Sequence, residues 1–321
     1  METKTEYTDE IFDNLWVNLH APKSIAEMVL SKEVRKQVNH FLEDNDIPNL
    51  IFCGKPGQGK TTLATLLCKE IGATSLKINA SRDNTIDVIR NRVTNFAQTM
   101  SYDGSLKVII LDEADRLTMD AQQALRGIIE EYAAHTRFIL TANEGARIHD
   151  ALKSRCIPLN VIPPFDDFKK YIVNILKVRS IKVTQESVKQ LAIALKKYYP
   201  DIRKTIGFIQ KSSVGGILTI DEQAEITDSF ISKLIKAIDN TDPIKIREIW
   251  LKSENEFQGD YQSLLKEIHN FIYENEDFNE ITRAKIILEI AEGLRNSTFV
   301  LDQEINFYEV ILKIMRNLGK F

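Results

Sequence analysis

The first half of the chain alternates short apolar runs with segments in which apolar residues recur at helical spacing. Near-continuous apolar runs such as VIIL and FILTA are typical of strands buried on both faces, and the helical segments between them indicate parallel crossover connections. This alternation predicts a doubly wound α/β domain. The predicted strands are Leu50–Cys53, Leu76–Asn79, Lys107–Leu111, Arg137–Thr141 and Ile157–Val161.

After Pro163-Pro164 the strand pattern stops, and apolar residues recur at the three- and four-residue spacing of helices. Helices are predicted over about 165–179, 184–198 and 201–212, with a break at Gly215-Gly216 because adjacent glycines interrupt helices.

From about Ile220 to the last residue the helical spacing continues, as in YQSLLKEIHNFIY and INFYEVILKIM. We therefore expect three domains: an α/β domain over residues 1–163, a small helical domain over 164–220 and an all-helical domain over 221–321.

No apolar stretch approaches the roughly 18 uncharged residues of a membrane span. The first residues, METKTEYTDEIFDNL, are acidic and polar, unlike a secretory signal. We therefore expect a protein of a cytoplasm-like compartment, with no membrane association.

The three cysteines (Cys53, Cys68 and Cys156) are too few and too scattered for a disulfide framework, and no Cys-x-x-Cys pair suggests zinc. The five histidines are isolated from one another as well. Reduced structural thiols and no metal-ligand cluster are the expectation.

The net charge of −4 argues against indiscriminate binding of nucleic acid, but the charge is unevenly distributed. Residues 161–222 hold 11 Lys and Arg against 6 Asp and Glu, whereas residues 223–321 hold 12 against 18. Any contact with DNA is therefore expected from local basic positions in the first 222 residues.

A phosphate-binding loop is predicted where GKPGQGKT fits G-x-x-x-x-G-K-[ST] at every fixed position. The apolar run LIFC precedes it and the helical pattern TTLATLLCKEIG follows it, which is the context that this motif requires. Glycines let backbone N–H groups approach phosphates, and the helix N-terminus adds its positive dipole end. Lys60 is expected to reach the β- and γ-phosphates and Thr61 to bind Mg²⁺. The predicted nucleotide-binding residues of this loop are Gly54, Lys55, Pro56, Gly57, Gln58, Gly59, Lys60, Thr61 and Thr62.

The segment VIILDEAD places Asp112 at the carboxyl end of an apolar strand, beside the predicted phosphate loop. There its carboxylate can hold Mg²⁺ through water, and Glu113 can polarise an attacking water. A solvated acidic turn is the alternative. Since no Asn-Lys-x-Asp guanine signature occurs, ATP is favoured over GTP, and the adjacent Asp-Glu pair favours hydrolysis over phosphate transfer.

Three further polar positions are candidates for the same site. Asn143 ends the next strand and can bond the γ-phosphate or the lytic water, or merely cap a turn. Arg155, in Lys-Ser-Arg-Cys, can act as an arginine finger or be a solvated cation. Arg203, in PDIRK, can lie over the γ-phosphate or belong to the surface.

These five pieces, in this order and spacing, resemble clamp-loader AAA+ ATPases, the replication factor C small subunits and their phage relatives, over about residues 10–210. The segments LWVNLHAPKSIAEMV, INASRDNTIDVIRNRVTNFA and DEADRLTMDAQQALRGIIEEY are also similar to that family, and the Ser-Arg-Cys triplet separates it from most other AAA+ proteins. TNFA, SYDGSLKVIILDEADR and YPDIRKTIG together look especially like the clamp-loader large subunit of T-even-type bacteriophages.

The resemblance implies an α/β P-loop AAA+ domain with a parallel sheet of order 5-1-4-3-2, a helical lid domain and an all-α C-terminal collar domain for oligomerisation. It implies that Lys60, Thr61, Asp112 and Glu113 act in cis, with Asn143 as sensor 1 and Arg203 as sensor 2. Arg155 would be donated to the ATP of a neighbouring subunit in a spiral of five.

The implied partners are other clamp-loader subunits, a sliding clamp and primer-template DNA held through its backbone. The positions that match DNA-tracking residues are Arg82, Thr85, Ile86 and Arg90, and those that match residues coupling DNA to the ATP site are Arg116, Gln122 and Arg126. A viral chain of this kind would work in the host bacterial cytoplasm.

Two departures from the family pattern stand out. The phosphate loop reads GKPGQG in place of GPPGTG, which makes Lys55 and Gln58 unusual, and Leu19-His20-Ala21-Pro22 replaces Lys-Tyr-Arg-Pro.

One helical apolar series is ambiguous. It is either a buried helix face or, at its end, a contact with the clamp through Phe96 and Met100. The series comprises Ile86, Ile89, Val93, Phe96 and Met100.

The predicted function is therefore an ATP-hydrolysing subunit of a sliding-clamp loader, with ATP and Mg²⁺ as cofactors, that opens the clamp and places it on primer-template DNA. The alternatives are another AAA+ DNA motor such as a helicase loader, a non-hydrolysing structural subunit of a clamp loader, or a small-molecule P-loop kinase.

Overall fold

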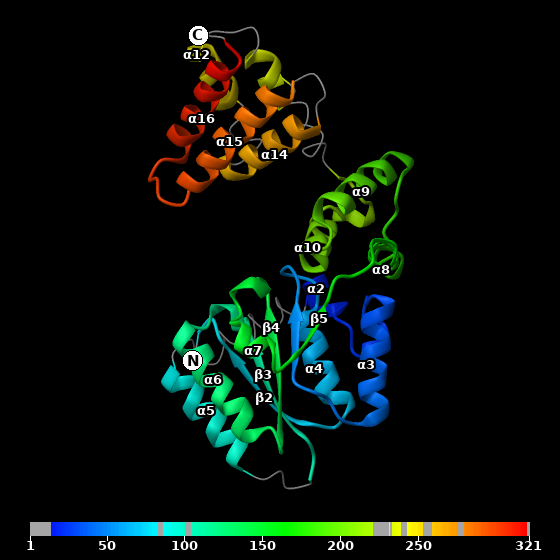
Figure 1. Ribbon diagram of the computed structural model, residues 1–321. Helices are drawn as coiled ribbons and strands as arrows, with labels where there is room; N and C mark the ends of the chain where they lie inside the picture. Colours follow the sequence, from blue (N-terminus) through cyan, green and yellow to red (C-terminus); the bar gives the residue numbers. More distant parts are fainter. Residues whose placement is uncertain are drawn as a thin grey trace, which may run out of the picture. The chain divides into compact units, whose positions relative to one another are not determined.

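A computed structural model describes residues 14–82, 86–99, 104–220, 231, 233–238, 243–252, 259–274 and 279–319, without the side chains of 86–89, Val214 and Glu274. The chain divides into two compact units, Met1–Ile220 and Asp221–Phe321. Figure 1 shows the α/β sheet and a group of helices in the first unit and only helices in the second.

The sheet of the first unit has five parallel strands in the order β2-β3-β4-β1-β5, which is the expected order read from its other edge. The expected fold class is thereby confirmed, with strand limits that differ from the prediction by at most two residues at either end. The strands are β1 (Leu50–Cys53), β2 (Thr74–Asn79), β3 (Lys107–Asp112), β4 (Thr136–Ala142) and β5 (Ile157–Asn160).

Helices cover both faces of this sheet (Figure 1). Because side chains alternate along a strand, β1 sends Leu50 and Phe52 into one core and Ile51 into the other. The first core is completed by α3 and α4 and the second by α5 and α6. The helices and 3-10 turns of this α/β part are η1 (Ile25–Glu27), α3 (Lys32–Asp44), α4 (Lys60–Glu70), α5 (Ile86–Gln98), η2 (Ala114–Arg116), α6 (Met119–Tyr132), η3 (Gly145–Arg147) and α7 (Asp150–Lys153).

Three lid helices follow the sheet and share a core built around Phe168, Ile172 and Ile209. They are α8 (Phe165–Val178), α9 (Gln185–Tyr198) and α10 (Ile202–Lys211), followed by the turn η4 (Val214–Gly216). Two of them begin where capping residues satisfy the first N–H groups, since Thr184 accepts from Ser187 N and Asp201 accepts from Lys204 N.

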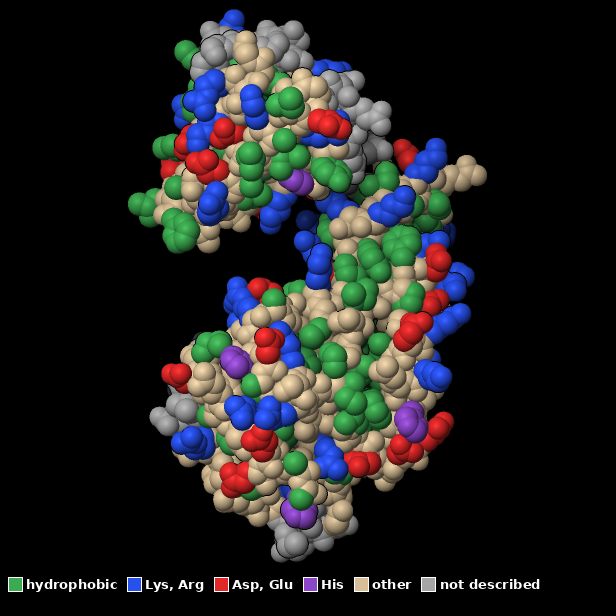
Figure 2. Space-filling model, viewed as in Figure 1, with side chains coloured by type: hydrophobic (Ala, Val, Ile, Leu, Met, Phe, Trp, Pro, Cys, Tyr) green, Lys and Arg blue, Asp and Glu red, His purple; other side chains and the backbone are tan. Residues whose placement is uncertain are grey.

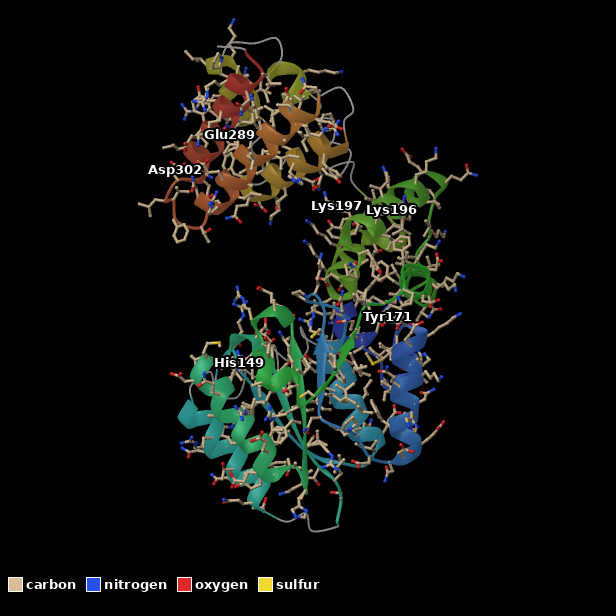
Figure 3. All side chains as sticks on the ribbon, viewed as in Figure 1. His149, Tyr171, Lys196, Lys197, Glu289 and Asp302 are labelled. Carbon is tan, nitrogen blue, oxygen red and sulfur yellow. The ribbon has the colours of Figure 1, made fainter. Side chains whose placement is uncertain are left out.

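The short helix α2 (Trp16–Leu19) packs on the lid although almost 200 residues separate it from α10 in sequence. The backbone N–H of Trp16 donates to Oε1 of Gln210 at 2.9 Å. The hydroxyl of Tyr171, which is labelled on α8 in Figure 3, donates to the carbonyl of His20 at 2.5 Å. The N-terminal segment is therefore tied to the lid by polar contacts as well as by apolar packing.

The described helices of the second unit share a hydrophobic core in which the Trp250 and Phe307 rings meet edge to face at 5.3 Å. Its helices are α12 (Pro243–Lys252), α14 (Tyr261–Glu274), α15 (Glu280–Asn296) and α16 (Gln303–Asn317). None of the described helices of the chain is both long and apolar enough to cross a membrane. The division into three domains remains a prediction.

Candidate nucleotide site

The loop between β1 and α4 has the backbone of a phosphate-binding loop. Gly54, Gly57 and Gly59 have φ values of +151°, +75° and +87°, which side chains with a Cβ rarely adopt. A Cβ on Gly57 would lie only 1.8 Å from Oδ1 of Asp201 at the start of α10. The backbone angle therefore favours glycine at all three positions, and at Gly57 the lack of space does so as well.

Lys60, the first residue of α4, is 7% exposed and turns its ammonium back into the loop. Its Nζ donates to the carbonyls of Gly54 and Lys55 and to Oδ1 of Asn143, each at 2.8 Å. Burial lowers the pKa of Lys60, and the carboxylates of Asp115 and Asp112 oppose this effect. The structure thus brings together the predicted phosphate-binding lysine and Asn143 at the end of β4.

Asp112, the last residue of β3, receives donors on both carboxylate oxygens. Its Oδ1 accepts from the hydroxyls of Thr61 at 2.5 Å and Thr141 at 2.8 Å, and its Oδ2 lies 3.1 Å from Nζ of Lys77. Burial alone would raise the pKa of Asp112, but the bonds from Thr61, Thr141 and Lys77 outweigh it and the pKa is lowered.

The pair of Thr61 and Asp112 fits Mg²⁺. Hydroxyl and carboxylate oxygens are the hard ligands that this ion prefers, and in nucleotide sites it is held through one or two carboxylates and the phosphates. Among the described residues no group of three or more His, Cys, Asp or Glu is placed to hold a metal alone. The residues therefore suit an ion that arrives with a nucleotide rather than an all-protein metal site.

Glu113 follows Asp112 in a left-handed conformation, with φ +58° and ψ +43°. This conformation is uncommon outside glycine, and it turns the chain sharply away from the strand. The backbone N–H of Glu113 donates to Oγ1 of Thr141 at 3.0 Å, and Asp115 accepts from the backbone N–H groups of Asn143 and Glu144. These hydrogen bonds connect the ends of β3 and β4 next to the half-buried Glu113.

A cavity of about 200 Å³ lies beside the phosphate loop, between the N-terminal segment and the lid helices α8 and α10. The exposed Arg203 lines it, and the backbone N–H of Ile202 donates to the carbonyl of Gly57 at 3.1 Å. The structure therefore places Arg203 next to the loop. The other lining residues are Val17, Asn18, His20, Ala21, Pro22, Glu27, Met28, Val29, Gly57, Gln58, Gly59, Thr62, Tyr171, Ile202 and Ile206.

Each departure from the family pattern contributes a lining residue to this cavity, Gln58 from the loop and His20 from the N-terminal segment. Nε2 of His20 accepts from Nε of Arg179 at 2.9 Å, so the ring proton is on Nδ1. Burial and, second, Arg179 lower the pKa of His20. Gln58 is buried, and within the described part of the chain its Oε1 has no hydrogen-bond partner.

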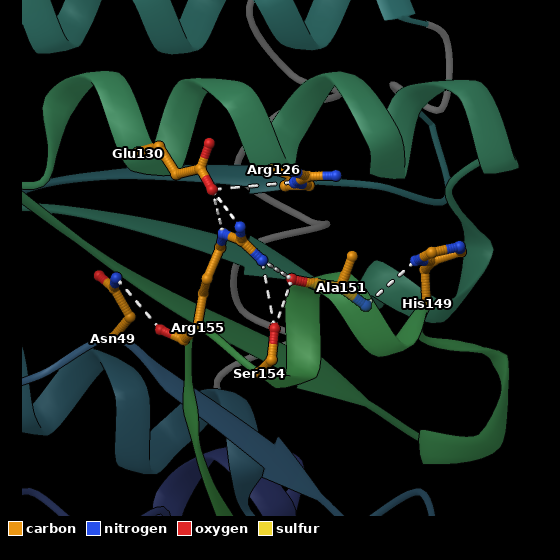
Figure 4. Close-up of polar contacts among 7 residues, drawn as sticks. All are labelled: Asn49, Arg126, Glu130, His149, Ala151, Ser154 and Arg155. Carbon is orange, nitrogen blue, oxygen red and sulfur yellow. Dashed lines mark hydrogen bonds and ion pairs between the residues drawn. The ribbon is translucent and has the colours of Figure 1, made fainter.

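Arg155 lies just beyond α7 and contacts α6 of its own chain (Figure 4). Its Nε donates to Oε1 of Glu130 at 2.6 Å, its Nη2 donates to the same oxygen, and its Nη1 donates to the carbonyl of Ala151 at 2.7 Å. No side-chain bond recorded for Arg155 among the described residues reaches the phosphate loop. The predicted finger thus lies apart from the cis site.

The predicted coupling residues have different environments. Gln122 is buried, and its amide group bonds Leu117, Arg147 and His149, which ties α6 to the segment before α7. Arg126 is exposed, with its Nε 3.8 Å from Oε1 of Glu130, and Arg116 is exposed on η2. Gln122 therefore has a structural role whatever else it does.

The predicted DNA-facing residues are only partly described. Arg82 and Arg90 are exposed, Thr85 lies outside the described residues, and so does the side chain of Ile86. Acidic and basic side chains are interspersed on the visible face of the first unit (Figure 2). Contact with DNA at these positions remains a prediction.

The ambiguous apolar series is described only in its middle. Val93 is fully buried, and Phe96 is half-buried with Nζ of Lys107 4.6 Å from its ring centroid. Met100 and the side chains of Ile86 and Ile89 lie outside the described residues. The described part favours a buried face at Val93.

Four residues at or beside the site were not singled out from the sequence: Lys77, Asp115, Glu130 and Thr141. A polar residue inside the apolar run FILTA was a visible signal for Thr141. Lys77 and Glu130 gave none, because their partners come from other elements.

Comparisons with known proteins show which family the chain resembles. Residues 50–163 match the family described as ATPase family associated with various cellular activities (AAA). The replication factor C small subunit of Sulfolobus acidocaldarius is 36% identical over 214 residues, which cover 64% of this chain and 65% of that subunit, just under two thirds of its length. Replication factor C subunit 4 of Saccharomyces cerevisiae is 33% identical over 252 residues, covering 74% of this chain and 77% of that protein.

Similarity extends further along the chain in a third relative. Replication factor C small subunit 2 of Pyrobaculum islandicum is 32% identical over 295 residues, covering 87% of this chain and 86% of that one. Two solved structures of RuvB variants from Thermotoga maritima match with TM-scores of 0.51 and 0.50 at 16% identity, over 69% of this chain and 80% of theirs. At that identity the match speaks for the fold alone.

Proposed function

The chain belongs to the replication factor C small-subunit family, and from this premise we propose that it is an ATP-hydrolysing subunit of a DNA sliding-clamp loader. The observation that carries the proposal is the convergence of Lys60, Thr61, Asp112 and Asn143 at one edge of the sheet. Lys60 bonds Asn143 and Thr61 bonds Asp112 there, so the residues proposed to bind phosphate, hold Mg²⁺ and position water lie at neighbouring strand ends.

In this proposal the site residues of this chain give up hydrogen bonds to one another and bind the phosphates and Mg²⁺ of a nucleotide instead. Lys60 gives up the carbonyls of Gly54 and Lys55 for oxygens of the β- and γ-phosphates. Thr61 and Asp112 hold Mg²⁺, which when bound neutralises phosphate charge. Glu113 and Asn143 orient the attacking water, and Arg203 closes the lid side of the site.

Arg155 is proposed to act in trans, on the nucleotide of a neighbouring subunit, because its recorded contacts lie in α6 and α7 rather than at its own phosphate loop. A guanidinium that meets the γ-phosphate across an interface makes the stability of that interface depend on the nucleotide state. Hydrolysis would then loosen the interface and release clamp and DNA.

The proposed partners are a sliding clamp, primer-template DNA and other loader subunits in a pentamer. Contacts from Arg82 and Arg90 to the DNA backbone would recognise duplex geometry and weaken with rising salt. We also propose, from the segments TNFA, SYDGSLKVIILDEADR and YPDIRKTIG, that the chain is closest to the clamp-loader large subunit of T-even-type bacteriophages and works in a bacterial host cytoplasm.

The test is ATP turnover by the purified complex with and without primed DNA and clamp. Both should stimulate turnover, together by about tenfold or more, and Glu113→Gln should abolish turnover while leaving nucleotide binding intact. Glu131→Gln, at an exposed glutamate of α6, is the matched control and should turn over normally. Turnover indifferent to primed DNA, or undiminished in Glu113→Gln, would refute the proposal.

A further inference from the structure

Lys77 is a cation beside the metal-binding carboxylate of the proposed site. It lies on β2, where its backbone pairs with Ile110 of β3, and its side chain reaches along the sheet to Asp112. The distance from Nζ of Lys77 to Oδ2 of Asp112 is 3.1 Å, with 48% and 13% of the two side chains exposed.

The pairing occupies the oxygen of Asp112 that the hydroxyls leave open. Thr61 and Thr141 both donate to Oδ1, so Lys77 is the recorded donor to Oδ2. In nucleotide sites the carboxylate often meets the metal through a bound water. A lysine ammonium and a metal-bound water offer a carboxylate the same feature, which is a hydrogen-bond donor backed by positive charge.

We propose that Lys77 is a positioning residue that competes with Mg²⁺ for Oδ2 of Asp112 and is displaced when Mg²⁺ and nucleotide bind. This inference rests on the proposed function, because it needs a magnesium-dependent nucleotide site. Displacement is feasible since half of the Lys77 side chain already faces solvent and can move outward without disturbing the core. If the Lys77 ammonium stayed beside Asp112, its positive charge would repel the bound Mg²⁺.

The consequence is a raised magnesium requirement. Breaking a partly exposed ion pair has a modest cost, which corresponds to a change of about two- to fivefold in the apparent magnesium affinity. The lysine therefore makes nucleotide loading sensitive to the free magnesium concentration.

The experiment measures binding of a fluorescent, non-hydrolysable ATP analogue to the full chain as magnesium is titrated, so that hydrolysis is not the readout. Lys77→Met should lower the magnesium midpoint about two- to fivefold, whereas Lys77→Arg should stay near the wild type. Lys69→Met, which removes an exposed lysine of α4, is the matched control and should change nothing. An unchanged or raised midpoint in Lys77→Met overturns the inference.

A second measurement uses the wild-type chain and does not depend on the variant folding. Mass spectrometry after brief acetylation should show Lys77 becoming more reactive when magnesium and the analogue are added, because the ammonium leaves Asp112. Unchanged or reduced reactivity overturns the inference. A wild type that binds no analogue at any magnesium concentration overturns the proposed function as well, whereas normal binding with an unmoved midpoint overturns only the role of Lys77.

Discussion

Arg155 donates from both Nε and Nη2 to one carboxylate oxygen of Glu130, and the Arg126 guanidinium lies 3.8 Å from the same oxygen. The guanidinium has five N–H groups, and its Nη1 also bonds the carbonyl of Ala151 and the hydroxyl of Ser154. These bonds hold the Arg155 side chain against its own chain, although 27% of it is exposed. To contact a phosphate with two parallel bonds it must exchange at least one of these partners.

Replacing Arg155 with Ala should separate binding from turnover. Nucleotide affinity of the isolated chain should stay within about twofold, because the side-chain bonds of Arg155 to described residues go to Glu130, Ala151 and Ser154 rather than to its own phosphate loop. DNA-stimulated turnover of the complex should fall by about three orders of magnitude, the usual contribution of an arginine finger. Arg147→Ala, which removes an exposed cation that pairs with Glu144, should leave turnover unaffected. Undiminished turnover in Arg155→Ala would remove the finger assignment.

Two Gly→Ala substitutions should have opposite effects. Gly57→Ala forces a side chain into a positive φ and against Asp201, so it should destabilise the first unit by about 1–2 kcal/mol and weaken nucleotide binding at least about tenfold. Gly127→Ala, in the exposed interior of α6 with no atom within 4 Å of the new Cβ, should stabilise by about 0.5–1 kcal/mol. Denaturant unfolding and nucleotide titration check both, and equal effects of the two would contradict the argument.

The contact between α15 and α16 depends on Gly293 of α15, which lies against the buried amide of Asn306 on α16. Asn306 is 4% exposed and its Nδ2 donates to the carbonyl of Gly293 at 3.0 Å, while a Cβ on Gly293 would lie 2.2 Å from Val310. Asn306→Ala and Gly293→Ala should each destabilise the second unit by about 1–3 kcal/mol, the first by a lost bond and a cavity and the second by overpacking.

Leu288→Ala is the control for that contact, because Leu288 is on α15 but 69% exposed, and it should cost no more than about 0.5 kcal/mol. Thermal unfolding followed by circular dichroism is the measurement. Similar transitions for all three variants would mean that the Gly293 contact does not stabilise the helix pair.

His20 should make stability depend on pH below neutrality. Its pKa is lowered from 6.5 in the folded chain, so the unfolded chain binds the proton more readily. The free energy of unfolding is therefore unaffected by His20 above about pH 6.5. It falls as the pH drops below that value, and it levels off once the pH is below the pKa of His20 in the folded chain. The melting temperature of His20→Asn should fall less than that of the wild type between pH 7.5 and 5.

Arg179→Met tests the cause of that shift. Since Arg179 contributes to it together with burial, its removal should reduce the acid-induced loss without abolishing it. Identical pH profiles for the wild type and His20→Asn would show that other groups account for the acid sensitivity.

Much of the fold and of the cis site could be predicted because the signals are local. Apolar runs predicted each strand to within two residues of its observed limits, and Gly54 and Gly59, which have positive φ, coincide with the two fixed glycines of the phosphate-loop pattern. Parallel strands then brought Asp112 and Asn143 to the same edge of the sheet as Lys60.

What could not be predicted are partners that come from distant segments. Lys77 meets Asp112 because β2 lies beside β3 in one register, and Glu130 meets Arg155 because α6 packs beside α7. The docking of Trp16 and His20 on the lid joins segments more than 150 residues apart. No residue pattern within either segment specifies the other.

The amino-acid sequence by itself determined the strands, the phosphate loop and the helix starts, because hydrophobic periodicity, glycine backbone freedom and side-chain capping act over a few residues. Only the tertiary structure decided which cation neutralises Asp112 and which carboxylate holds Arg155. These pairings depend on strand register and helix packing, and the free energy of the whole core sets both.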